Sequence, residues 1–349
     1  MLAPPDTTLI RPRAIANWLL AVAALVLAMI VVGGITRLTE SGLSITRWEP
    51  VTGTLPPLDE ASWQAAFDLY RQSPQYLEVN RGMSLADFKA IYFWEYVHRL
   101  LGRVIGLAFA LPLAWFAWKR AIPRGYGWKL VGLLALGGLQ GAIGWWMVAS
   151  GLIDVPEVSH IRLAVHLLTA FTIFGALIWV AMDLRVLQRS PVARPARIGT
   201  AAIWALALLY IQMLFGAYVA GLEAGYAFNT WPLMGDELYP AAAEVMRPIA
   251  RNFVDNPVAV QFTHRWFAFV AAVGIQLVAI KAWRAGERRS ALVLTAALIF
   301  QIQLGSAAIV TGVRLESGVA HQAMAALLLA ALLATAHRLG QRAVEAAPA

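Results

Sequence analysis

An acidic residue and a histidine stand three positions apart in the stretch EYVHR, which runs from Glu95 to Arg99. On a helix this spacing puts Glu95 and His98 on one face, one turn apart. The stretch opens a long apolar segment, so both groups would lie at the edge of a membrane span, where ionisable side chains are costly and usually functional. A carboxylate in such a place can act as a general base or stabilise positive charge.

Histidine recurs in three further apolar segments. Those inside the predicted spans are His98, His166, His264 and His321. Each lies 17 to 21 residues from the first basic residue beyond its span, or about 25–32 Å along a helix, so all share one depth. A lone histidine is readily explained as a hydrogen-bonded helix contact, but two pairs on neighbouring helices predict axial ligands of haem. Zinc would need three or four ligands. We interpret His160 and His337, at span ends, as interfacial residues.

The composition indicates a membrane protein. Of 349 residues, 60% are hydrophobic and 14% are charged, whereas soluble chains carry roughly 25% charged residues. The chain has no cysteine, which excludes disulfides, thiolate metal sites and iron–sulfur clusters. The net charge of +8 does not indicate nucleic-acid binding, because the basic residues lie in short loops between apolar segments, where they set membrane orientation.

Eight segments are apolar and long enough to cross a bilayer, which predicts an all-α polytopic membrane protein. They cover residues 15–36, 91–118, 128–149, 161–184, 198–221, 258–283, 290–312 and 318–338. The first is expected to be a retained helix and not a signal peptide. Because the basic loops share one side, that side and both termini should be cytoplasmic, with the histidines near the periplasmic side.

The first outer loop, residues 37–90, is too long to be a simple connection. It contains the amphipathic segment DEASWQAAFDLYRQ, which we expect to lie on the membrane surface. Ser84 followed by Asp87 resembles a capping box, so the helix that carries His98 should begin before the membrane.

The chain consists of two halves that repeat each other in sequence. EYVHRLLGRVIG around His98 corresponds to QFTHRWFAFVAAVG around His264, LQGAIGWWMVASG aligns without a gap with FQIQLGSAAIVTG, and Trp48 matches Trp231. Each half has an even number of spans, so the halves should be parallel and related by a pseudo-twofold axis along the membrane normal. We therefore predict two four-helix bundles, residues 1–190 and 191–349.

The two halves differ beside the first histidine of each pair. Glu95 precedes His98 by three residues, whereas Gln261 precedes His264. Glutamine is nearly isosteric with glutamate but exchanges no proton near neutral pH. We therefore predict chemistry in the N-terminal half and a fixed redox haem in the C-terminal half. The alternative is that Glu95 only pairs with Arg99 one turn later.

Other repeated residues could serve the same sites. A Q-x-x-x-G spacing joins Gln140 to Gly144, Gln212 to Gly216 and Gln301 to Gly305, with Met29 and Gly33 at the same spacing in the first span. These glycines could provide close helix packing or let a porphyrin face approach the backbone. Arg99, Arg162 and Arg265 are candidates to bind haem propionates, and interfacial snorkelling is the alternative.

Over nearly its whole length the chain resembles the heme A synthase family. The resemblance rests on GGITRLTESGLSITRWEP, EYVHRLLGR, RLAVHL, FNTWPLMGD, QFTHR and GVAHQ. It implies stepwise oxidation of the C8 methyl of haem O to a formyl group, giving haem A for cytochrome c oxidase in a bacterial inner membrane. It further implies that His264 and His321 hold haem b, that His98 and His166 flank the substrate haem O, and that Glu95 is the catalytic acidic residue. A haem O synthase and oxidase assembly factors are expected partners, with an electron acceptor that the sequence does not name. Some members carry a cysteine pair in the first outer loop, and this chain departs from them.

Two other functions fit parts of the pattern. A non-enzymatic diheme cytochrome b would also use bis-histidine pairs, although carriers across a membrane usually place haems toward opposite faces. A haem or lipid transporter could be built from parallel repeats, but it has no evident need for Glu95 in one half only.

Overall fold

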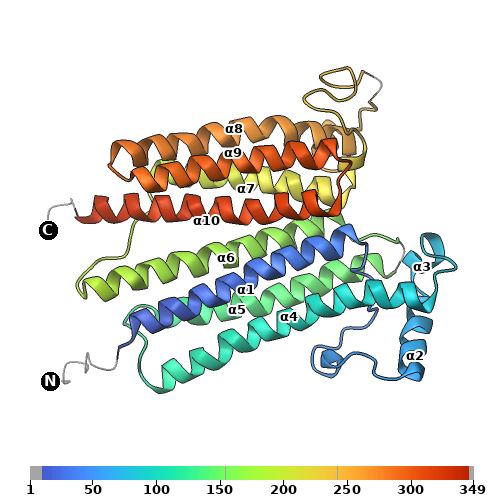
Figure 1. The fold of residues 1–349 in the computed structure, drawn as a ribbon, viewed down its shortest axis with the longest axis horizontal. Helices are drawn as coiled ribbons and strands as arrows, with labels where there is room; N and C mark the ends of the chain where they lie inside the picture. Colours follow the sequence, from blue (N-terminus) through green and yellow to red (C-terminus); the bar gives the residue numbers. More distant parts are fainter. Residues whose placement is uncertain (1–9, 154, 242, 346–349) are drawn as a thin grey trace.

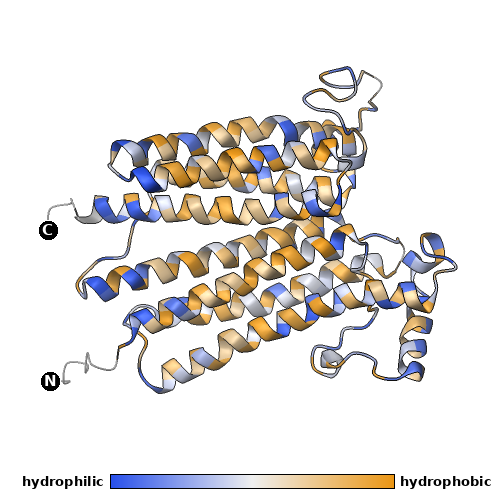
Figure 2. Ribbon diagram, viewed as in Figure 1, coloured by the Kyte–Doolittle hydropathy of each residue, from blue (hydrophilic) through white to orange (hydrophobic). Residues whose placement is uncertain are grey.

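The computed structural model describes residues 10–153, 155–241 and 243–345. Within them, eight helices are long and apolar enough to span a membrane, which confirms the prediction of an all-α polytopic protein. They are α1 (Pro12–Leu38), α4 (Leu85–Trp118), α5 (Gly127–Val148), α6 (His160–Arg189), α7 (Thr200–Gly221), α8 (Pro257–Arg284), α9 (Arg288–Val310) and α10 (Leu315–Glu345). Apolar residues fill their middles and polar residues collect at their ends (Figure 2).

Local sequence explains where several of these helices begin. Pro12 and Pro257 open α1 and α8 at the first helical turn, where the missing N–H of proline costs nothing. Asn256 caps α8 by accepting from the amides of Val258 and Ala259. Ser84 caps α4 and accepts from the amide of Asp87. The cap predicted at Ser84 is therefore confirmed, and α4 begins at Leu85.

The helices pack in chain-local groups (Figure 1). Helix α1 packs against α4 and α6, and α5 packs against α6, while α8 packs against both α7 and α9, and α9 against α10. The two groups meet through α1 with α10, α6 with α7, and α6 with α10. In the sequence repeat, α1 corresponds to α7 and α6 corresponds to α10. The contact of α1 with α10 is therefore the repeat equivalent of the contact of α7 with α6.

One apolar core runs through both groups. Its fully buried side chains include Leu19 on α1, Leu177 on α6, Leu294 on α9 and Leu329 on α10. The outward faces of the spans carry exposed large apolar residues such as Trp128 and Trp204, as expected for helices that face lipid.

The outer segment between α1 and α4 forms a small cap of its own, with helices α2 (Glu60–Tyr70) and α3 (Pro74–Glu78). Figure 1 shows α2 running across the direction of the spans. Its apolar residues Phe67 and Tyr70 are buried against Tyr76 and Phe88. The apolar face of α2 is therefore covered by the protein, so its amphipathic pattern is explained without contact with the membrane surface. Aromatic residues from α3 and the start of α4 bury the face of α2 that its sequence periodicity suggested would contact lipid.

Candidate haem-binding sites

Each of the four intramembrane histidines lies against a glycine of a neighbouring helix. A Cβ atom added at Gly144 would be 2.9 Å from Cε1 of His166, at Gly216 3.0 Å from His264, at Gly305 2.8 Å from His321, and at Gly33 3.1 Å from His98. Carbon atoms normally approach to about 3.5–4.0 Å, so any larger residue would push the imidazole away. The sequence left open whether these glycines provide close helix packing or face a porphyrin, and the structure places them against the imidazole rings.

Three of these histidines also have a glutamine at Nδ1. The distance from the side-chain nitrogen to Nδ1 is 3.2 Å for Gln140 and His166, 3.0 Å for Gln212 and His264, and 3.3 Å for Gln301 and His321. Gln140 and Gln212 also donate to the backbone oxygen of the same histidine, at 3.0 Å each. The Q-x-x-x-G spacing thus places a glycine against the ring and an amide against its nitrogen, one turn apart on one helix.

The histidine pairs line two separate cavities. His264 and His321 line one of about 250 Å³, together with Gly216, Gly305 and Trp231. His98 and His166 line the other, of about 270 Å³, together with Met29, Gly33 and Gln140. The structure therefore brings together the residues that the sequence paired, two in each half of the chain.

The geometry of the C-terminal pair fits haem ligation. The ring centres of His264 and His321 are 6.4 Å apart, and the ring planes are nearly perpendicular at 87°. Two imidazoles on opposite faces of one haem iron have ring centres about 6 Å apart, because each Fe–N bond is about 2 Å long. Among the described residues no group of three or more metal-ligating side chains occurs, so these pairs suit a porphyrin-held metal better than a bare ion.

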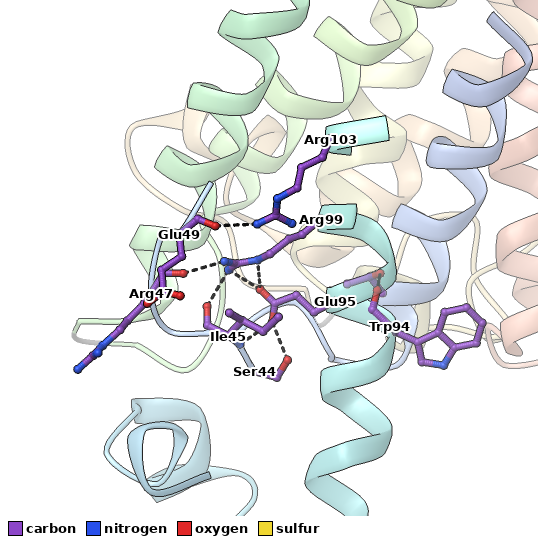
Figure 3. A network of polar contacts seen from close by, with 9 residues as sticks. Ser44, Ile45, Arg47, Glu49, Trp94, Glu95, Arg99 and Arg103 are labelled. Atoms are coloured by element: carbon purple, nitrogen blue, oxygen red, sulfur yellow. Dashed lines mark hydrogen bonds and ion pairs between the residues drawn. The ribbon is translucent and has the colours of Figure 1, made fainter. Parts of the chain in front are cut away.

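Glu95 lies on α4 and points toward the outer segment that follows α1 (Figure 3). Its Oε2 accepts from the hydroxyl of Ser44 at 2.6 Å and the amide of Ile45 at 2.7 Å. Its Oε1 accepts from Nε and Nη2 of Arg99, at 3.1 and 2.6 Å. The Glu95 residue is 3% exposed, and both of its carboxylate oxygens are paired. It is not among the residues that line the cavity of His98 and His166.

Arg99 continues this network. It donates to the backbone oxygens of Arg47 and Ile45, and Arg103 donates to those of Pro50 and Glu49. Figure 3 shows the two arginines on successive turns of α4, both directed at the outer segment. Neighbouring Gly42 and Leu43 line the cavity, so Glu95 and Arg99 together fix one wall of the site.

The second half repeats this arrangement without a carboxylate. Gln261 donates to the backbone oxygen of Phe228 at 3.0 Å. Buried Arg265 donates to the oxygens of Phe228, Thr230 and Leu233 at 2.7 to 3.0 Å. In both halves, the residue three positions before the histidine and the arginine directly after it thus anchor an outer loop. Trp231, the match of Trp48, stands on this loop and lines the cavity of His264.

The structure accounts for the remaining candidates as follows. Arg162 donates to the backbone oxygen of Trp146 at 2.8 Å and lies over its ring. His160 begins α6 and lies 3.4 Å from Asp255. His337 is buried and pairs with Asp183 at 2.9 Å. His337 is therefore a buried helix-to-helix contact, which corrects its interpretation as an interfacial residue.

One charged pair that sequence analysis missed stands between the cavities. Arg37 on α1 contacts Glu223, which follows α7, at 3.1 Å, and donates to the backbone oxygen of Ala220 at 3.0 Å. Arg37 and Glu223 line both cavities. Arg37 and Glu223 are 186 positions apart, so no local spacing could have predicted the contact.

Comparison with known proteins gives the family. Residues 16–333 match the cytochrome oxidase assembly protein family, COX15-CtaA. The chain belongs to this family. Family relatives named heme A synthase include those of Rhizorhabdus wittichii, 55% identical over 97% of this chain and 98% of the relative, and Sphingopyxis alaskensis, 52% identical over 95% and 94%. A third, from Rhodospirillum centenum, is 49% identical over 97% and 91%. The family named from the sequence motifs is therefore confirmed.

Proposed function

We propose that this member of the family is a heme A synthase, an oxidoreductase that converts a ring methyl of haem O to a formyl group and so makes haem A. The observation that carries the proposal is the presence of two cavities, each lined by two histidines that close-packed glycines hold in place. Relatives that match almost end to end carry that name. A carrier with two equivalent haems would not need halves that differ in their charged residues.

We further propose that the chain comprises two four-helix bundles, residues 1–190 and 191–349, with different contents. His264 and His321 would hold haem b as resident cofactor, and the 6.4 Å between their ring centres supports this. His98 and His166 would hold the iron of substrate haem O. Haem b supplies reversible one-electron transfer when bound, and the acceptor beyond it is a further partner.

Glu95 is proposed as the catalytic carboxylate of the first half. Its two oxygens carry four hydrogen bonds, two of them from the guanidinium of Arg99. Because Arg99 balances its charge and Glu95 does not line the cavity, the carboxylate would act on the substrate from behind the cavity wall, by its electrostatic field. Action as a proton acceptor would first require release of Ser44 or Arg99. Through Ser44 and Ile45 the same carboxylate positions the wall formed by Gly42 and Leu43.

The orientation in the membrane is also a proposal. The basic loops place both termini on the cytoplasmic side, and Figure 1 shows the two ends of the described chain on one side of the bundle. The histidine sites would then lie near the periplasmic side of a bacterial inner membrane. A haem O synthase and cytochrome c oxidase assembly factors are the partners that would supply substrate and take product.

The experiment is expression in cells that make haem O but lack a heme A synthase, followed by pigment extraction and chromatography. The wild-type chain should convert haem O to haem A. Glu95→Gln should leave haem O unconverted, because the isosteric amide preserves the bonds to Ser44 and Arg99 only in part. The protein should keep its haem b, since the proposed haem b site lies in the other half of the chain. Undiminished haem A formation by Glu95→Gln would show that Glu95 is not required for the reaction. Unchanged haem O with the wild-type chain would favour the diheme carrier.

A further inference from the structure

The three glutamines at histidine Nδ1 share an unexplained feature. Oε1 of Gln140, Gln212 and Gln301 is buried and has no hydrogen-bond partner in the described part of the chain. A buried acceptor without a partner costs about 1–3 kcal/mol, and here it occurs beside each of three histidines. The repetition indicates a common role for the amides.

That role follows from the chemistry of a ligating imidazole. When Nε2 binds a metal, a neutral imidazole carries its proton on Nδ1, so Nδ1 needs an acceptor. Half a turn of the Gln301 amide about its last bond would bring Oε1 to Nδ1 of His321, since its nitrogen already lies 3.3 Å from that atom. For Gln140 and Gln212 the same turn also gives up the bond to the backbone oxygen of the histidine, in exchange for accepting the Nδ1 proton. The two ends of an amide are nearly interchangeable in shape. The amide beside each of these three histidines is thus the group placed to accept the Nδ1 proton in the haem-bound state.

The fourth histidine lacks such a partner. Met29 occupies the equivalent position on α1, four residues before Gly33, and its methyl group lies against α4 at Gly102. Met29 lines the cavity beside His98. Neither ring nitrogen of His98 makes a hydrogen bond to any described residue. Thioether sulfur is only a weak acceptor, so Met29 cannot fix the His98 ring as glutamine fixes the others.

We infer that this glutamine-to-methionine difference makes His98 the exchangeable ligand of the substrate haem. Outer partners of metal-bound histidines orient the ring and strengthen the bond, and their loss costs 10–100-fold in affinity. His264 and His321 both have such a partner, which suits a resident cofactor. His166 has one and His98 has none, which suits a haem that must enter and leave. The inference rests on the proposed function and concerns substrate and product release.

The first test measures how fast haem b leaves the C-terminal site. Purified full-length protein is mixed with excess apomyoglobin, which captures released haem and shifts its Soret band. Gln301→Met should release haem b about 10–100-fold faster than wild type. Gln301→Glu, which keeps an acceptor oxygen, should restore slow release. The matched control is Gln276→Met on α8, whose amide oxygen accepts from Thr295 away from the histidines.

The second test gives His98 the missing partner. Met29→Gln, purified from cells that supply haem O, should contain more haem O and haem A per protein than wild type. These haems should also leave the protein about tenfold more slowly or slower still. Met29→Leu should behave as wild type. This variant gains a function, so it reports even where Gln301→Met fails to fold.

The inference is overturned if Gln301→Met releases haem b as slowly as Gln276→Met, or if Met29→Gln retains no more non-b haem than Met29→Leu. Either result leaves the proposed function intact as long as His264→Ala loses haem b. Retention of haem b by His264→Ala would instead contradict the assignment of the cofactor site.

Discussion

Gly305→Ala is expected to displace His321, the proposed axial ligand of haem b, without changing any polar group. The added Cβ would lie 2.8 Å from Cε1, 3.3 Å from Nδ1 and 3.5 Å from Nε2 of His321. Because carbon atoms pack at about 3.5–4.0 Å, the ring must move by roughly 0.7 Å. Sites of this kind tolerate about 0.5 Å of misplacement, and overpacking costs about 1–3 kcal/mol. Haem b affinity should therefore fall by about 5- to 150-fold.

The assay is haem b per protein, measured as the pyridine haemochrome of purified full-length protein over a range of added haemin. Gly141→Ala is the matched control, because a Cβ at Gly141 meets nothing within 4 Å and lies one turn from Gly144 on α5. Gly141→Ala should bind haem b as wild type does. Equal haem b content in Gly305→Ala and Gly141→Ala would refute the claim that the glycine sets the position of the imidazole.

Three further outcomes follow from the described contacts. Asp183→Asn should lower the melting temperature in detergent, since removing one member of the buried pair with His337 costs about 3 kcal/mol; an unchanged melting temperature would contradict a structural role. The near-perpendicular rings of His264 and His321 should give ferric haem b a strongly anisotropic low-spin EPR signal, whereas a rhombic signal would indicate parallel rings. Arg265→Lys keeps the charge but not the fork that reaches three backbone oxygens. Amide hydrogen exchange in residues 228–233 should therefore accelerate by about tenfold or more. Unchanged protection would show that the loop is stable without these bonds.

The sequence was sufficient for the membrane spans and for the pairing of the histidines. The eight spans, the cap at Ser84 and the pairing of His98 with His166 and His264 with His321 all follow from helical spacing and from the repeat. The repeat was decisive because each half served as a control for the other. It distinguishes Glu95 from Gln261 on the sequence alone.

Contacts that depend on rotamers and long-range neighbours could not be predicted in this way. The sequence left open whether Glu95 faces the cavity or pairs with Arg99, and the structure has the pair. It offered Arg99 and Arg265 as propionate ligands, whereas both donate to loop carbonyls. Spacing along a helix predicts which face a side chain lies on but not its exact direction. Partners in an outer loop show no sequence periodicity from which a contact could be predicted.

The division of labour between the halves is tested most directly by the haem content of two histidine variants. His264→Ala and His166→Ala are purified from cells that supply haem O, and their pigments are separated by chromatography. His264→Ala should lack haem b, whereas His166→Ala should keep haem b but yield no haem A. Loss of haem b from His166→Ala together with its retention in His264→Ala would contradict the assignment of substrate to the first half and cofactor to the second.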